Sequence, residues 1–95
     1  MTNVAKDSEL HDLYALLLSL ETEEDCAALL EDLCTKKEVA AMAQRVRAAR
    51  LLLSGETYEQ IIAQTDISSA TLSRVSRCVQ YGEGYRRFLG KQAEE

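Results

Sequence analysis

Helix-start signals recur along this chain and limit its fold class. A Ser, Thr or Asp precedes each of five segments with helical apolar spacing, at Asp7 or Ser8, Thr22, Thr35, Thr57, and Ser68 or Ser69. A side-chain oxygen at such a position accepts a hydrogen bond from a backbone N–H of the first turn. Proline is absent, and only four glycines interrupt the 95 residues. The pattern predicts an all-α protein.

Six helices in one domain follow from these starts and from apolar residues spaced three and four apart. We expect them at residues 7–20, 23–33, 35–54, 58–64, 68–81 and 83–90, with a frayed tail over 91–95. Gly55, Gly82 and Gly90 end helices in this prediction. The long helix carries one apolar face, made by Val39, Met42, Ala43, Val46, Ala49 and Leu53.

Charge is distributed unevenly along the chain. Residues 1–34 hold nine acidic side chains and one basic one, a net charge of −8, whereas residues 35–95 hold ten basic and seven acidic ones, a net charge of +3. Screening limits the reach of charges to about 8–10 Å at ordinary salt, so a polyanion responds to the segment that it approaches. The overall net charge of −5 therefore does not exclude a nucleic-acid partner.

The first 34 residues carry more apolar surface than so small a chain buries easily. Their first helix has an apolar stripe made by Leu10, Leu13, Tyr14, Leu17 and Leu18. Single domains below about 100 residues are only marginally stable. We therefore expect a homodimer in which the helices of residues 1–34 supply much of the interface.

Membrane, metal and enzymatic functions find little support in the sequence. The longest apolar run, residues 13–20, is shorter than the roughly 18–20 residues of a membrane span, and the N-terminus lacks an apolar signal segment, which indicates a cytoplasmic protein. The three cysteines, Cys26, Cys34 and Cys78, form no CxxC pair and no spacing typical of zinc. His11 is the sole histidine and has no nucleophile beside it in sequence, so we expect no enzyme and no metal site.

Residues 57–81 fit a helix-turn-helix, in which two short helices are joined by about four residues. Apolar side chains fall at the inner faces of both helices and in the turn, at Ile61, Ile62, Ile67, Leu72 and Val75. Asp66 stands at the joint, where the backbone is commonly left-handed and Asp is among the few tolerated residues other than Gly. The pattern predicts that the second helix enters a DNA major groove.

That second helix begins with small side chains, in the run SSATLSR, which allow its end to approach base edges. Arg74 and Arg77 follow on adjacent turns and suit a phosphate or a guanine. The predicted DNA-binding residues are Thr57, Ser68, Ser69, Ala70, Thr71, Ser73, Arg74 and Arg77. The same pattern also fits a plain amphipathic pair, with arginines solvated or paired to Glu59 and Glu83, or a module that binds another protein instead of DNA.

Two longer segments resemble the Trp repressor superfamily, and specifically its YerC/YecD-type branch. The segment over 35–61 contains the capping box TKKE and the run QRVRAARLL, and the segment over 67–89 contains ATLSRVSRC and YGEGY. The resemblance implies a six-helix protomer intertwined with its twin, in which the fourth and fifth helices form a DNA-reading head. It also implies a bacterial transcription repressor that binds palindromic double-stranded DNA, with heads in major grooves about 34 Å apart.

The resemblance also locates an effector pocket between the long helix and the DNA-reading helix. The matching residues are Thr35, Arg45, Arg74, Val75 and Cys78. Val75 and Cys78 stand where the family's namesake has a glycine that makes room for tryptophan and a serine that bonds its amino group. Overpacking a close-packed slot typically costs about 1–3 kcal/mol, so we expect no tryptophan corepressor and no other cofactor. Another small-molecule effector, or arginines paired to nearby acids with no ligand, both stay open.

Overall fold

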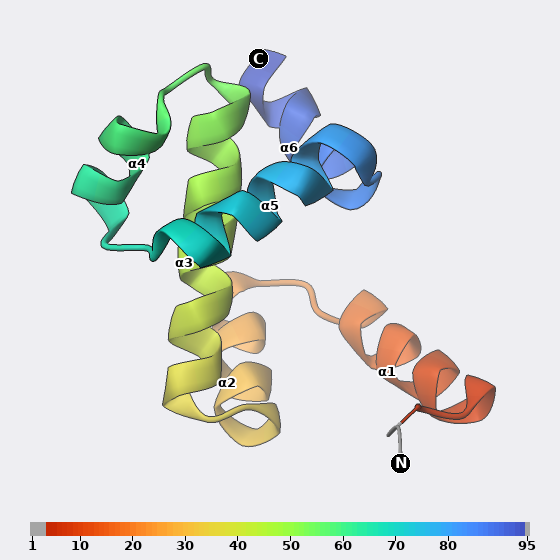
Figure 1. The fold of residues 1–95 in the computed structure, drawn as a ribbon. Helices are drawn as coiled ribbons and strands as arrows, with labels where there is room; N and C mark the ends of the chain where they lie inside the picture. Colours follow the sequence, from red (N-terminus) through yellow and green to blue (C-terminus); the bar gives the residue numbers. More distant parts are fainter. Residues whose placement is uncertain (1–3, 95) are drawn as a thin grey trace. The chain divides into compact units, whose positions relative to one another are not determined.

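Within residues 4–94, which the computed structural model describes (side chains over 4–90), the chain forms six α-helices and no strand (Figure 1). The helices are α1 (Asp7–Leu18), α2 (Glu23–Leu33), α3 (Lys36–Leu53), α4 (Tyr58–Thr65), α5 (Ser69–Tyr81) and α6 (Gly84–Glu94). They divide into two compact units, unit 1 (Met1–Thr35) and unit 2 (Lys36–Glu95).

The helix starts follow the predicted signals at α2 and α3. Thr22 caps α2, because its side-chain oxygen accepts a hydrogen bond from the Asp25 N–H at 3.0 Å. The Asp25 carboxylate accepts in return from the Thr22 N–H at 3.3 Å, which completes a capping box. α3 begins at Lys36, directly after Thr35. Local sequence is therefore sufficient to place these starts.

α1 differs from the prediction at both ends. Asp7 is the first helical residue, so the cap position falls on Lys6 rather than on either of the next two residues. Lys6 has no side-chain oxygen, and instead its backbone N–H donates to the Glu9 carboxylate at 2.9 Å. The helix ends at Leu18, two residues before its predicted end. The Glu9 carboxylate thus satisfies the N–H of the cap residue itself, which is the returning half of a capping box.

α6 is longer than predicted, because it continues through Gly90 to Glu94. Glycine ends a helix when its backbone turns left-handed, as Gly55 does at φ +91° after α3, whereas Gly90 does not take a positive φ. The residues that follow, 91–93, are Lys, Gln and Ala, all good helix formers. The predicted stop at Gly90 and the frayed tail over 91–94 are therefore wrong; residue 95 lies outside the described part of the chain.

Unit 2 is built around α3, against which α4, α5 and α6 all pack. In Figure 1, α5 crosses α3, while α4 lies beside the same stretch of α3. The buried core combines residues of three helices and the joint between two of them: Ala48, Ala49, Leu51, Ile61, Ile67, Leu72 and Val75. Four of the five residues predicted for the inner side of the helix-turn-helix are buried, and the fifth, Ile62, is half-buried against this core.

The buried part of α3 is narrower than its predicted apolar face. Only its C-terminal half contributes fully buried residues, among them Ala48 and Ala49, neither of which has any exposed surface. Val46, assigned to the face, is 39% exposed. The apolar spacing identifies the helix but does not show where along its length the other helices of unit 2 pack.

Unit 1 has no buried residue in either of its helices. Its apolar side chains are instead partly or largely exposed, as at Leu17 (43%), Leu18 (85%) and Leu33 (49%). An apolar side chain gains stability in proportion to the area that it removes from water. The helices of unit 1 therefore obtain little of that stabilisation within one chain.

Across the described residues, no helix combines the length and the apolar character needed to cross a membrane.

Candidate nucleic-acid interface

The first helix of the motif, α4, begins with the predicted capping box. The Thr57 side-chain oxygen accepts from the Gln60 N–H at 3.2 Å, and the Gln60 side-chain oxygen accepts from the Thr57 N–H at 2.8 Å. Two of the backbone donors at the start of α4 are thereby satisfied. Thr57 is exposed, and its hydroxyl keeps one hydrogen that it can donate to an external acceptor.

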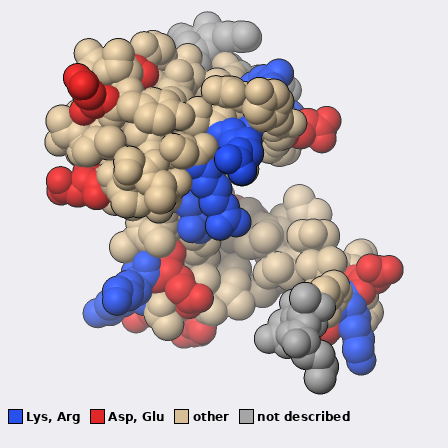
Figure 2. Space-filling model, viewed as in Figure 1, with Lys and Arg blue, Asp and Glu red and all other residues tan. Residues whose placement is uncertain are grey.

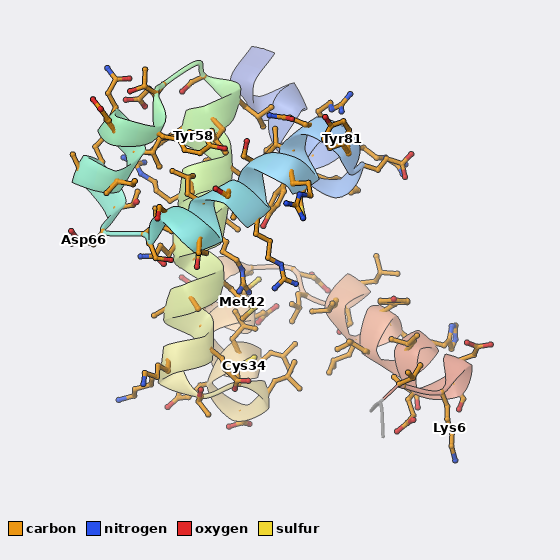
Figure 3. The ribbon with its side chains drawn as sticks, viewed as in Figure 1. Lys6, Cys34, Met42, Tyr58, Asp66 and Tyr81 are labelled. Atoms are coloured by element: carbon orange, nitrogen blue, oxygen red, sulfur yellow. The ribbon has the colours of Figure 1, made fainter. Side chains whose placement is uncertain are left out.

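The joint between α4 and α5 is a left-handed turn at Asp66, as predicted. Asp66 has φ 59° and ψ 16°, and its N–H donates to the Ile62 carbonyl at 3.0 Å. Figure 3 places Asp66 at this corner and Tyr81 at the opposite end of α5. The side-chain amide of Gln44, on α3, donates to the Thr65 carbonyl at 3.0 Å. The corner is thus fixed both by its own backbone and by a bond from the helix beneath it.

The second helix, α5, has one face locked in the core and one face open. Leu72, Val75 and Ser76 are buried against the rest of unit 2. Ala70, Arg74 and Arg77 are exposed on the opposite side of the helix, and the exposed Ser69 and Ser73 lie four residues apart along the border between the two faces. No acidic residue occurs in the first turn of α5, so nothing there repels an anion from the positive end of its dipole.

The eight predicted DNA-binding residues do not all present free groups. Ser68 caps α5, because its oxygen accepts from the Thr71 N–H at 3.1 Å, and its hydroxyl donates to the Thr71 oxygen at 2.9 Å. These two residues hold the helix start in place, and Thr71 is half-buried. Five of the predicted residues are exposed along α5, namely Ser69, Ala70, Ser73, Arg74 and Arg77.

Basic side chains gather where α5 crosses α3. Figure 2 shows this patch of Lys and Arg on the face that it draws. Arg45, from α3, and Arg74, from α5, line the same hollow and so contribute to the patch from two different helices. A patch of one sign raises the local concentration of polyanions and steers their approach. Arg45 was predicted only for an effector pocket, and the packing of unit 2 brings it beside residues of α5.

The hollow holds four of the five predicted effector residues. It has a volume of about 240 Å³ and is lined by Arg45, Arg74, Val75, Cys78 and Tyr85. Thr35 is not among its lining residues. Tyr85 comes from α6, and nothing in the local sequence near the other four could have identified it. Val75 is 2% exposed and belongs to the core, so its side chain forms part of the packed wall of the hollow.

Two residues shape the end of α5: Gly82, which was predicted to end the helix, and Arg86, which the sequence did not identify. Gly82 follows the helix, and a Cβ at this position would lie 2.6 Å from the carbonyl oxygen of Cys78. Only glycine permits this close approach. Arg86, from α6, donates from Nε to the Val79 carbonyl at 3.1 Å and from its terminal nitrogen to the Gln80 carbonyl.

Within the residues described, no cluster of His, Cys, Asp and Glu could hold a metal ion.

Comparison with known proteins agrees with this architecture. The model of the family described as Trp repressor protein matches residues 8–93. A solved structure from Staphylococcus aureus, whose description proposes a Trp repressor, superposes with a TM-score of 0.88 at 34% identity, covering 95% of this chain and 91% of that one. A TrpR-like protein from Eubacterium eligens ATCC 27750 gives a TM-score of 0.87 at 34% identity, covering 92% and 91%.

The chain therefore belongs to the Trp repressor family, whose fold serves regulators and not enzymes. Within that family it falls in the YerC-type branch. The protein YerC of Bacillus subtilis strain 168 is 41% identical over 90 residues, which cover 94% of this chain and 86% of YerC. The predicted family and branch are confirmed.

Proposed function

We propose that this protein is a sequence-specific transcriptional repressor that binds a palindromic operator as a homodimer. The observation that carries the proposal is the division of α5 into a buried face and an open face. Leu72 and Val75 anchor the helix in the core, while Ser69, Ser73 and Arg77 stay exposed along it. A helix held in this way has a fixed orientation, which base readout requires.

The exposed residues suit both kinds of DNA contact. Small side chains at Ser69 and Ala70 allow the start of α5 to approach base edges, and the Ala70 methyl suits the thymine methyl. Arg74 and Arg77 supply the charge for phosphates or for the acceptor pair of a guanine. A regulator that reads chromosomal DNA in this way works in the cytoplasm of a bacterium, which is where we place it.

The proposed homodimer is supported by the exposed apolar surface of unit 1. Leu17, Leu18 and Leu33 keep between 43% and 85% of their surface exposed in a single chain. A second copy that covers these side chains would supply the burial that one chain lacks. Two copies related by a dyad would also present two DNA-reading helices to successive major grooves, about 34 Å apart.

We propose that tryptophan does not act as the corepressor. Val75 occupies the core beside the hollow, and making room for an indole ring would require moving a packed side chain. Arg45 and Arg74 line the hollow from two different helices, and both could instead contact DNA phosphates. The test is calorimetric titration of the protein with tryptophan, beside a Val75→Gly variant. Tight binding of tryptophan by the wild-type chain would contradict this proposal.

A second candidate function is a module that binds another protein through its acidic segment. The net charge of −8 in residues 1–34 favours a basic partner surface. This candidate predicts that binding to the partner survives removal of DNA but not removal of the acidic charges. The DNA-binding proposal predicts the reverse dependence.

The decisive experiment is selection of duplexes from a random DNA pool at physiological salt. We expect enrichment of a two-fold symmetric site with half-sites one helical turn apart. The enriched duplex should then bind two chains, as measured by sedimentation of the complex. If no sequence is enriched with or without cell extract, the DNA-binding proposal fails and the protein-interaction candidate takes its place.

A further inference from the structure

The last turn of α5 has its carbonyl groups satisfied from outside the helix. An α-helix leaves its last four C=O groups without internal partners, which in α5 are those of residues 78–81. The Gly82 N–H donates to the Cys78 carbonyl at 2.8 Å. Arg86 donates to the next two carbonyls, those of Val79 and Gln80. Three of the four groups are thus bonded, and one side chain of α6 accounts for two of them.

Arg86 stands at a position that is unfavourable for its own helix. It lies in the first turn of α6, where the positive end of the helix dipole repels a cation. α5, by contrast, has no basic residue in its own last turn, where a cation is stabilising. The guanidinium of Arg86 bonds to that end of α5. The charge that α5 lacks is therefore supplied by α6.

The last turn of α5 directly follows a predicted DNA contact, Arg77. In an α-helix the carbonyl of residue 77 accepts from the N–H of residue 81, so the turn that Arg86 bonds also holds the carbonyl of Arg77. Fraying of that turn would break this bond and loosen the backbone beside Arg77. A side chain on a frayed turn loses its fixed direction and must be ordered again on binding, which weakens affinity.

We propose that Arg86 is a positioning residue for DNA readout, which fixes the last turn of α5 by bonding its carbonyl groups from α6. This role rests on the proposed function, because it matters for DNA only if α5 reads DNA. Arg86 acts through α5 and need not touch the duplex. It makes the direction of the DNA-reading helix depend on the placement of α6.

Arg87 provides a matched control. It is the next residue of α6, carries the same charge and is also exposed. Its guanidinium lies 5.3 Å from the centre of the Phe88 ring, on its own helix. Arg87→Met and Arg86→Met therefore remove the same charge from neighbouring positions, and only the second removes the bonds to α5.

The test compares wild type, Arg86→Met, Arg86→Lys and Arg87→Met on the duplex selected with the wild-type protein, over a range of salt. We expect Arg86→Met to weaken binding by about three- to tenfold, as for loss of a charge-assisted hydrogen-bond pair. The slope of affinity against salt should stay unchanged, because no phosphate contact is lost. Lysine should restore part of the affinity, and amide exchange at residues 79–82 should be faster in Arg86→Met alone.

Three outcomes would overturn the positioning role while wild-type binding persists. A salt slope lowered by about one would make Arg86 a direct phosphate contact. Equal effects of Arg86→Met and Arg87→Met would reduce both to general charge. A lower melting temperature with undiminished affinity of the folded protein would leave Arg86 a stability residue only. Failure of the wild-type protein to enrich any duplex would instead overturn the proposed function itself.

Discussion

The two units of this chain differ in how far they bury the apolar side chains of their helices. Unit 2 buries residues from α3, α4 and α5 in one core, and its surface gathers basic side chains. Unit 1 has two well-formed helices, α1 and α2, with no buried residue, and residues 1–34 carry a net charge of −8. Both units have capped amphipathic helices, so capping and spacing alone do not produce a core.

The difference indicates where each kind of function resides. A unit that completes its own core can hold a reading helix in a fixed direction without help. A unit with exposed apolar faces gains stability only when another surface covers them. The proposed function thus assigns DNA recognition to unit 2 and self-association to unit 1. The four predictions that follow test this separation.

The largest expected effect is on the core of unit 2. Ile61→Ala removes a side chain with no exposed surface, and we expect it to lower the free energy of unfolding by about 2–5 kcal/mol. Leu17→Ala, at a side chain 43% exposed in unit 1, should change the unfolding midpoint mainly at low protein concentration, where association matters. Urea unfolding at several concentrations measures both. Similar losses at high concentration would contradict the separation.

The next effect is on DNA binding. Arg74→Ala and Arg77→Ala should each cost about 1–3 kcal/mol of binding free energy if the arginine reads a guanine, or lower the salt slope by about one if it contacts a phosphate. Lys6→Ala removes the one basic side chain of residues 1–34 and should leave the affinity for DNA unchanged. A mobility-shift titration at several salt concentrations checks this. A loss with Lys6→Ala equal to that with Arg74→Ala would mean that unit 1 also contacts DNA.

A smaller effect separates two glycines of unit 2. Gly82→Ala places a Cβ 2.6 Å from a backbone carbonyl, so the chain must shift, and we expect a loss of about 1–3 kcal/mol of stability. Gly90→Ala meets no atom within 4 Å inside a continuous helix and should gain roughly 0.5–1 kcal/mol. Thermal unfolding followed by circular dichroism distinguishes them. Loss of stability in both variants would show that a side chain at residue 90 is also not tolerated.

The smallest effect compares two capping boxes of the same design. Thr57→Ala and Thr22→Ala each remove a hydroxyl that accepts from a backbone N–H, at a typical cost of about 1 kcal/mol. The loss at Thr57 should appear at every protein concentration, because α4 belongs to the core of unit 2. The loss at Thr22 should appear as weaker self-association, measured by sedimentation equilibrium. A concentration-independent loss at Thr22 would mean that α2 is stable within one chain.

Features that depend on a few neighbouring residues were predictable from the sequence. The caps at Thr22, Thr57 and Ser68 and the left-handed turn at Asp66 depend on bonds within four residues, and the structure shows each one. The inner faces of α4 and α5 followed from helical spacing. These interactions are local, so the residues that form them lie close together in the sequence.

Features that join distant residues were not predictable in the same way. Tyr85 lines the hollow with Arg45, and Arg86 bonds to carbonyl groups of α5, because α6 packs against both α3 and α5. The sequence predicted that Gly90 ends α6. Whether a glycine ends a helix depends on its backbone angle and on the residues that follow it, and Gly90 does not take a positive φ. The roles assigned to the eight DNA-binding residues and to the effector residues stay predictions.

Two alanines of α3 restrict how α4 and α5 can move. Ala48 and Ala49 have no exposed surface, so a single methyl group separates the α3 backbone from what packs on it at each position. Such close-packed contacts are barely compressible and transmit displacement instead of absorbing it. α4 and α5 therefore have little freedom to slide over α3. In the proposed dimer, a signal that changes the spacing of the two copies of α5 should therefore move α3, α4 and α5 together as one rigid unit. The distance from the Gln44 side chain to the Thr65 carbonyl should then be the same in the free protein and in the proposed DNA complex.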